Sequence, residues 1–160
     1  SFALPKQNNN LSQLTPFLYK LVEKATFRMR TYGYKTQGIY VSILYTNGCH
    51  WHMSKKIADP LYYFGDVYKI AYKIFVQSPY NYKVRNIAVA CFNLIKTNIT
   101  QTNLFDDLVK KEKLADSVDK INKKWGDSVV TPAKILSTKG VVKDRISFGG
   151  VKELEGMVIE

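Results

Sequence analysis

The sequence predicts an α+β domain in which two helices pack on one face of a four-stranded, mainly antiparallel sheet. Apolar residues recur with helical spacing in two segments and alternate with polar residues in four others, in the order βαββαβ. Each predicted helix has one apolar stripe and each predicted strand has one apolar face. Both helices are therefore expected on the same face of the sheet, with the other face left open. A further helix and an irregular tail are expected after the domain.

The first two elements are a short strand over residues 1–7 and a helix over residues 11–30. Asn9 or Asn10 is placed to cap the helix, because a short polar side chain can accept a hydrogen bond from the first free backbone amides. The helix is expected to end near Gly33. Its apolar stripe consists of Leu11, Leu14, Leu18, Leu21 and Ala25.

A β-hairpin follows, because residues after Thr36 alternate with a period of two and Asn47-Gly48 is typical of a tight turn. The returning strand is expected over residues 49–57. The core side of the hairpin is expected to hold Ile39, Val41, Ile43, Tyr45, Cys49, Trp51 and Met53. The opposite face of the returning strand would hold His50, His52, Ser54 and Lys56.

The second helix is expected to begin at Asp59-Pro60, with Asp as the N-cap and Pro at the first helical position. It would end near residues 77–79. Its buried stripe consists of Leu61, Phe64, Val67, Ala71, Ile74 and Phe75. The fourth strand is expected over residues 83–95. Its core face would hold Ile87, Val89 and Cys91, and its open face Asn86, Ala88 and Ala90.

The composition changes near residue 100, where we place a domain boundary. Residues 101–126 are expected to form a polar connector and a charged helix, and residues 127–160 a tail without strong periodicity. The helix stripe consists of Leu114, Val118, Ile121 and Trp125. The two cysteines are expected to act as small buried hydrophobes, without a disulfide. Because the chain opens on Ser1 rather than Met, we expect it to be a piece of a longer protein.

Positive charge is the most informative bulk property. The chain carries a net charge of +11. Through residue 100 there are 13 Lys and Arg against 3 acids, and from residue 101 there are 11 against 10. A basic domain of this kind favours a polyanionic partner such as duplex DNA, bound through its phosphates. The alternative is a lysine-rich solvated surface. The candidate contacts lie in or beside the strands: Lys6, Ser54, Lys55, Lys56, Lys83, Arg85 and Asn86.

Neither a catalytic site nor a metal site is predicted in this chain, and no cofactor is expected. Two-metal catalysis needs two or three convergent carboxylates, whereas Glu23, Asp59 and Asp66 lie in predicted helical segments. His50 and His52 share a strand face but are too few for a zinc site. No apolar run approaches the ~20 residues of a membrane span. We therefore expect no membrane partner and a cytoplasmic location.

Several segments resemble a known family. The segments SFALPK (residues 1–6) and VRNIAVACFNL (residues 84–94) are similar to the little finger of Y-family translesion DNA polymerases, which include DNA polymerases IV and V. QTNLF (residues 101–105), DKINKKWG (residues 119–126) and DRISFG (residues 144–149) resemble segments that follow it in bacterial members. The resemblance implies binding across the primer–template duplex. It also implies a catalytic core in cis, outside this chain, that uses Mg²⁺. Ala90 stands where members often have a basic residue.

Gln101, Leu104 and Phe105 fit the Q-x-x-L-F pentapeptide with which bacterial polymerases bind the sliding clamp. In this mode an extended peptide fills an apolar cleft with its last two side chains, while the glutamine amide binds at the rim. Thr102 stands where Leu is commoner, which predicts a lower affinity. The alternative is an ordinary connector that packs on the domain.

Two other function classes stay open. RNA-recognition motifs share the βαββαβ order, but residues 49–56 lack their Lys/Arg-Gly-aromatic run. Preference for single-stranded RNA over duplex DNA would favour that class. The chain could instead act only through protein contacts, made by the clamp-like peptide and the tail. Clamp binding without DNA binding would favour this second class.

Overall fold

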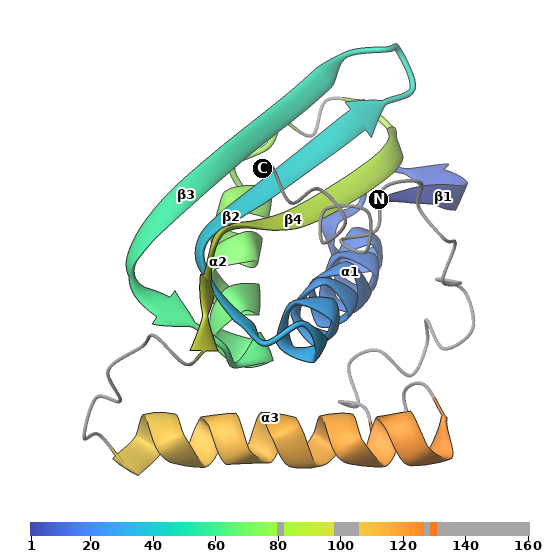
Figure 1. The fold of residues 1–160 in the computed structure, drawn as a ribbon. Coiled ribbons are helices and arrows are strands. Elements are labelled where there is room, and N and C mark those ends of the chain that lie inside the picture. Colours follow the sequence, from blue (N-terminus) through green and yellow to red (C-terminus); the bar gives the residue numbers. More distant parts are fainter. Residues whose placement is uncertain (80–81, 98–105, 127–128, 131–160) are drawn as a thin grey trace, which may run out of the picture.

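The fold is described by a computed structural model for residues 1–79, 82–97, 106–126 and 129–130 (Figure 1). The elements are β1 (Phe2–Asn8), α1 (Leu11–Thr31), β2 (Tyr34–Tyr45), β3 (His50–Leu61), α2 (Phe64–Phe75), β4 (Val84–Lys96) and α3 (Asp106–Trp125). The predicted α+β class, the order βαββαβ and the helix that follows it are confirmed.

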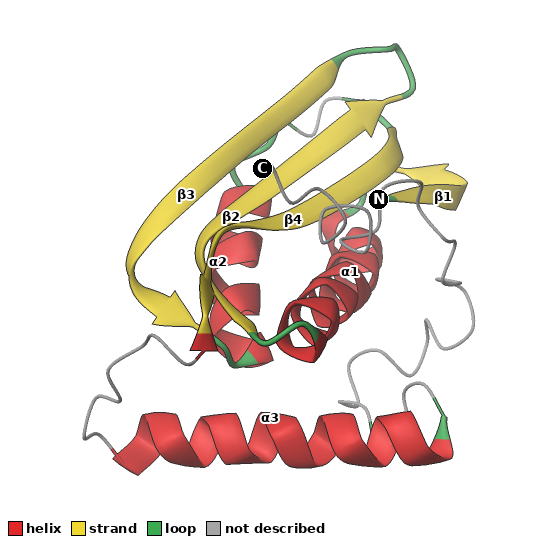
Figure 2. Cartoon of the chain, in the orientation of Figure 1, coloured by secondary structure: helices red, strands yellow, loops and turns green. Residues whose placement is uncertain are grey.

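The strands form one sheet in the order β1-β4-β2-β3, and every neighbouring pair is antiparallel. Helix α1 connects β1 to β2, with β4 lying between these two strands, and α2 connects β3 to β4, with β2 between them. Both helices cover the same face of the sheet, as predicted (Figure 2). The other face is left uncovered by α1 and α2, and β3 is an edge strand.

The core lies between this sheet face and the two helices. It is built from the apolar stripes of the helices and from alternate residues of the central strands, because these are the side chains that point into the layer between them. The most deeply buried members are Leu14, Leu18, Val22, Ile39, Val41, Ile43, Val67, Ala71, Phe75, Val84 and Ile87. All have essentially no exposed surface.

Both ends of α1 have the predicted residues, a capping asparagine at the start and a glycine after the end. Asn10 is the N-cap, and its Oδ1 accepts a hydrogen bond of 3.0 Å from the backbone amide of Ser12. At the other end, Gly33 has a φ of 74°, and its amide donates to the carbonyl of Arg30 at 2.8 Å. This left-handed conformation favours glycine and stops the helix.

The predicted start of the second helix is wrong. Asp59 and Pro60 lie in β3, and α2 begins at Phe64 after Tyr63, whose side chain makes no capping hydrogen bond. Leu61 pairs with Thr36 of β2 across a register shift, so pairing along β2 holds this segment extended. Pro60 is tolerated because β3 is an edge strand, where a missing backbone N–H costs no pairing on the outer side.

Cys49 does not join the core side, contrary to prediction. It is exposed and lies in the turn, and β3 begins one residue later at His50. Gly48 has a φ of 85° and donates to the carbonyl of Tyr45, while Asn47 Oδ1 accepts from the Cys49 amide at 3.0 Å. The loop is therefore the longer hairpin form that contains a left-handed glycine. Cys91, in contrast, is half-buried and packs against the core.

Candidate nucleic-acid interface

Cross-strand pairing defines the open face of the sheet. Residues directly opposite each other share a face, and Ser42 of β2 lies between His52 of β3 and Ala88 of β4. The next pairs in each direction continue the same face. The open face therefore holds Leu44, Ser42, Tyr40 and Gly38 of β2, His50, His52, Ser54 and Lys56 of β3, and Asn86, Ala88, Ala90 and Phe92 of β4. This is the assignment that the alternation predicted for β3 and β4.

Three short side chains, Ser42, Ala88 and Ala90, lie together in the middle of the open face. The ring of Phe92 lies directly over Gly38, where a Cβ atom would stand only 2.4 Å from it. A surface with few projecting side chains lets the backbone of a long polymer approach the strands closely.

Rings and hydroxyls follow the β3 edge of this surface. The imidazoles of His50 and His52 stack with centroids 5.3 Å apart, and the His52 ring lies 5.8 Å from the ring of Tyr40. Ser54 continues the row and is exposed. Together these groups offer several hydrogen-bond donors along one edge, of the kind that contact phosphate oxygens.

The predicted basic residues do not all lie on this face. Lys56 lies on it, opposite Gly38, whereas Lys55 lies opposite Ile39 and so belongs to the helix-covered face, exposed at the sheet edge. Arg85 is the extra residue where the pairing of β4 with β2 shifts register near the hairpin, and it is exposed. The side chain of Lys6, in β1, lies outside the described part of the chain.

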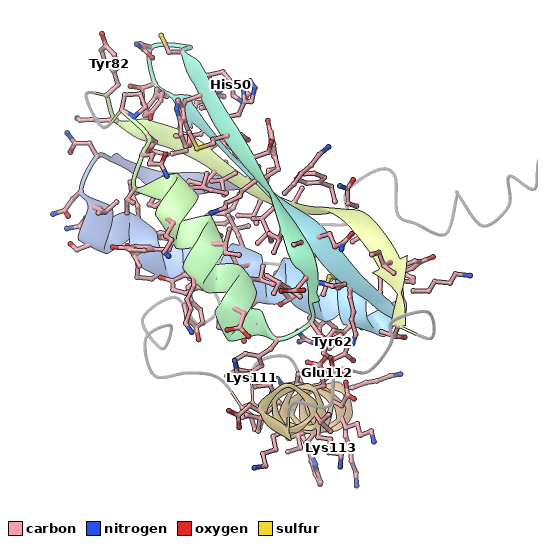
Figure 3. All side chains as sticks on the ribbon, turned by 90° about the vertical axis from the view of Figure 1, so that its left-hand side faces the viewer. His50, Tyr62, Tyr82, Lys111, Glu112 and Lys113 are labelled. Carbon is pink, nitrogen blue, oxygen red and sulfur yellow. The ribbon has the colours of Figure 1, made fainter. Side chains whose placement is uncertain are left out.

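The end of the sheet near the hairpin carries two of the predicted cations. Lys83 directly precedes β4, and its carbonyl accepts a hydrogen bond of 2.9 Å from the amide of Thr46 in the hairpin loop. Lys83 and Arg85 are therefore close to this loop, where Figure 3 places His50 and Tyr82 at the same end of the molecule. Asn86 lies on the open face between Leu44 and Ala3.

Lys96 is a further basic residue of this surface that sequence reasoning missed. It pairs with Tyr34 at the far end of β4 and is exposed. The signal was present, because residue 96 is in the same even-numbered alternation as Asn86, Ala88 and Ala90. The predicted strand ended one residue too early to include it.

Five exposed cations lie in or beside β3 and β4. Over the described residues, no carboxylate forms a salt bridge with Lys55, Lys56, Lys83, Arg85 or Lys96. Their charges remain available to a bound anion. Positive charge also occurs on the helix side of the domain, where Lys24, Arg28 and Lys73 lie on α1 and α2.

Helix α3 crosses the end of the domain that lies away from the hairpin (Figure 1). Asp119 accepts hydrogen bonds of 2.6 and 2.8 Å from the guanidinium of Arg30, and Glu112 forms a 2.6 Å ion pair with Lys35. The Tyr62 hydroxyl donates to Asp116, and burial together with this carboxylate raises the pKa of Tyr62. Two cations of the domain are thus neutralised by α3.

No metal centre is apparent in the parts of the chain that the structure describes. No group of three or more His, Cys, Asp and Glu residues there is arranged to hold an ion. None of the helices found in those parts is long and apolar enough to cross a membrane. The predicted clamp-binding residues Gln101, Leu104 and Phe105 lie outside the described residues.

A family model, the impB/mucB/samB family C-terminal domain, matches residues 1–104. The chain belongs to this family. Its curated relatives include DNA polymerase IV 1 of Halalkalibacterium halodurans, which is 23% identical over 85% of this chain and 34% of the relative. DNA polymerase IV 2 of Bacillus subtilis is 28% identical over 83% of this chain and 33% of the relative. This member of the family thus spans about a third of the length of the curated relatives it matches.

Solved structures support the same fold. The chain is similar to Dbh DNA polymerase in a post-insertion binary complex, with a TM-score of 0.51 and 20% identity over 59% of this chain and 28% of that one. A Y-family DNA polymerase chimera that contains Dbh gives a TM-score of 0.52 and 19% identity over 59% of this chain and 27% of that one. Together with the family model and the curated relatives, this fold confirms the resemblance to the little finger of Y-family polymerases.

Proposed function

We propose that this domain binds the primer–template duplex of a translesion DNA polymerase through the phosphate backbone. The catalytic core, with its Mg²⁺ ions, would lie elsewhere in the polypeptide. The observation that carries the proposal is a set of five cations, Lys55, Lys56, Lys83, Arg85 and Lys96, around a sheet face that α1 and α2 leave uncovered. None of the five forms a salt bridge with a carboxylate of the described residues. Family membership supports it, since the curated relatives are DNA polymerases. The domain would work in the cytoplasm at the nucleoid.

Phosphate contacts explain why binding is expected to be independent of sequence. Lysine and arginine side chains that contact phosphates position a duplex, but they do not read its base edges. The short side chains of Ala88 and Ala90 cannot reach into a groove to make base-specific hydrogen bonds. Ser54, His52 and Asn86 are suited to add neutral hydrogen bonds to phosphate or sugar oxygens.

The proposal is tested by the salt dependence of duplex binding. If four to six phosphates are neutralised, the slope of log K against log salt is about −4 to −5. Replacing Lys56, Arg85 and Lys96 together by Ala is expected to reduce the slope by about 3, because each lost phosphate contact removes about one unit. Fluorescence anisotropy of a labelled duplex measures both quantities.

Lys73→Ala supplies the control, since Lys73 is exposed on α2, on the covered side of the sheet. This change removes one positive charge without touching the proposed surface, and is expected to leave the slope unchanged. A wild-type slope near zero, or an equal effect of charge removal on both sides of the domain, would contradict the proposal.

We also propose that residues 101–105 bind the bacterial sliding clamp. The support is the Q-x-x-L-F pattern of Gln101, Leu104 and Phe105, placed directly after the folded domain. Leu104→Ala combined with Phe105→Ala is expected to abolish clamp binding in surface plasmon resonance while duplex affinity stays the same. Unchanged clamp affinity of the double variant would remove this part of the proposal.

A further inference from the structure

The apolar stripe of α3 faces away from the domain. Leu114 is 53% exposed, Ile121 40% and Trp125 68%. The helix instead docks through its acidic face, with Ala115 at 6% exposure beside Glu112 and Asp119. In Figure 3, Glu112 lies on the side of α3 near Tyr62, and Lys113 points away from the domain. Three large apolar side chains on one helix are thus left in solvent.

The exposed stripe has the spacing of a helix–helix seam. Leu114, Val118, Ile121 and Trp125 are separated by four, three and four residues, which is the alternation of a and d positions in a heptad repeat. With 3.6 residues per turn, the four side chains fall within an arc of about 60°. So narrow a stripe is typical of packing against one partner helix rather than of burial in a broad core.

Exposed lysines border this seam on the flank away from the domain, whereas Lys111 on the other flank is paired with Asp66. On the helical wheel Lys110, Lys113, Lys120 and Lys124 follow the stripe on the flank away from the docked face, and all four are exposed. Lys124 also lies 5.0 Å above the ring of Trp125. The acids of the central part of α3, Glu112, Asp116 and Asp119, are turned to the domain and already have partners there.

Two valines lie on the other flank of the seam, near Asn122. Asn122 exchanges two hydrogen bonds with the backbone of Val130, at 2.9 and 3.2 Å, so Val130 lies beside the helix. Val129 and Val130 are 53% and 40% exposed. They add exposed apolar surface beside Asn122, on the flank opposite the lysine row.

We propose that this strip is a docking surface for an amphipathic helix of a partner protein that carries acidic residues beside its own apolar stripe. The a/d spacing of the stripe indicates that the partner element is a helix, and the lysine row indicates that this helix is acidic. A second copy of this chain fits poorly, because antiparallel pairing would place the two lysine rows against each other. An anionic lipid surface is the other partner that a lysine-bordered apolar stripe suits. The a/d spacing favours a helix over lipid, and the vesicle measurement in the test separates the two.

The test uses the whole 160-residue chain and two synthetic helical peptides of three heptads. Both peptides carry Leu at the a and d positions, and the flanking e and g positions are Glu in one and Lys in the other. Fluorescence anisotropy of the labelled peptides is expected to show binding of the Glu peptide, and binding of the Lys peptide that is at least about tenfold weaker. Ile121→Ser is expected to weaken Glu-peptide binding about tenfold or more.

Val76→Ser is the matched control, because Val76 is also 40% exposed but lies at the end of α2. It is expected to leave peptide affinity unchanged. The double variant Lys110→Glu and Lys124→Glu is expected to reverse the preference between the two peptides without removing an apolar contact. This variant keeps the test valid if Ile121→Ser fails to fold.

Four outcomes would overturn the proposal. They are no binding of either peptide, equal binding of both, dimerisation of the chain through α3 in analytical ultracentrifugation, and displacement of the Glu peptide by vesicles that contain anionic lipid. A preference for the Glu peptide that follows the lysine row and Ile121 supports it.

Discussion

Removing the carboxylate of Asp119 is expected to release α3 from the domain. The Arg30 side chain is only 6% exposed, and the Asp119 side chain 19%. Their two hydrogen bonds, at 2.6 and 2.8 Å, form a two-pronged ion pair, which is among the stronger polar contacts in proteins. After Asp119→Ala, Arg30 would keep one weak acceptor, the carbonyl of Tyr62 at 3.3 Å.

The magnitude follows from this partial burial. Deleting one partner of a fully buried pair costs about 3–5 kcal/mol. Because Asp119 keeps some contact with water, we expect a loss of about 2–3 kcal/mol. This corresponds to a fall in the docking constant of about 30- to 150-fold. The remaining contacts of α3 include Lys111 with Asp66 at 3.1 Å, a more exposed pair that contributes about 0–1 kcal/mol.

Hydrogen exchange of the α3 amides measures the effect. An isolated helix of about 20 residues is marginally stable in water, so released α3 should lose most of its protection while the sheet amides keep theirs. Lys69→Ala is the control, because the Lys69 side chain is 74% exposed and lies 3.5 Å from Asp66. It should change protection by less than about 0.5 kcal/mol. Unchanged α3 protection in Asp119→Ala would refute the reasoning.

Two further predictions concern the sheet. Gly38→Ala should destabilise the domain by about 1–3 kcal/mol in urea unfolding, because a Cβ atom there would lie 2.4 Å from the Phe92 ring. An unchanged free energy of unfolding would contradict this prediction and mean that the Phe92 ring moves aside without an energetic cost. At pH 8 a thiol reagent should label exposed Cys49 much faster than Cys91, since burial raises the pKa of Cys91 from 9.0 to about 11. The native state favours the neutral form of the Cys91 thiol. The stability that this preference contributes is complete below pH 9 and is lost as the pH rises to about 11. Replacing Cys91 by Ala should remove that pH dependence, and equal labelling rates would contradict the burial of Cys91.

The fold was predictable because, over most of the domain, the spacing of apolar residues in the sequence matches the side chains that pack in the core. Alternation placed Ile43 and Ile87 on the core face, and the structure pairs them directly. The capping residue Asn10 and the terminating Gly33 act within their own helix turn, so a local pattern was sufficient to find them. The same alternation predicted the residues of the open face, because these are the strand residues whose side chains point away from the core.

Features that depend on distant partners were not predictable from local signals. Asp59-Pro60 resembles a helix start, but pairing with β2 keeps it extended. The apolar stripe of α3 gave no sign of which helix face docks, because the docked face is the one whose carboxylates contact Arg30 and Lys35, which come from the ends of other elements. Lys55 was grouped with Lys56 by sequence, whereas sheet register separates the two faces.

The cations around the open sheet face and the charged end of the domain that binds α3 should act independently. Asp119→Ala tests this expectation as well. Release of α3 would free Arg30 and Lys35, two cations that Asp119 and Glu112 now neutralise. Lys35 pairs with Ile95 on the helix-covered side of the sheet, so neither cation is placed to reach a duplex on the open face. We therefore expect Asp119→Ala to leave the salt slope of DNA binding unchanged. A slope steeper by about two units would mean that the duplex extends over this end, where α3 would then compete with DNA.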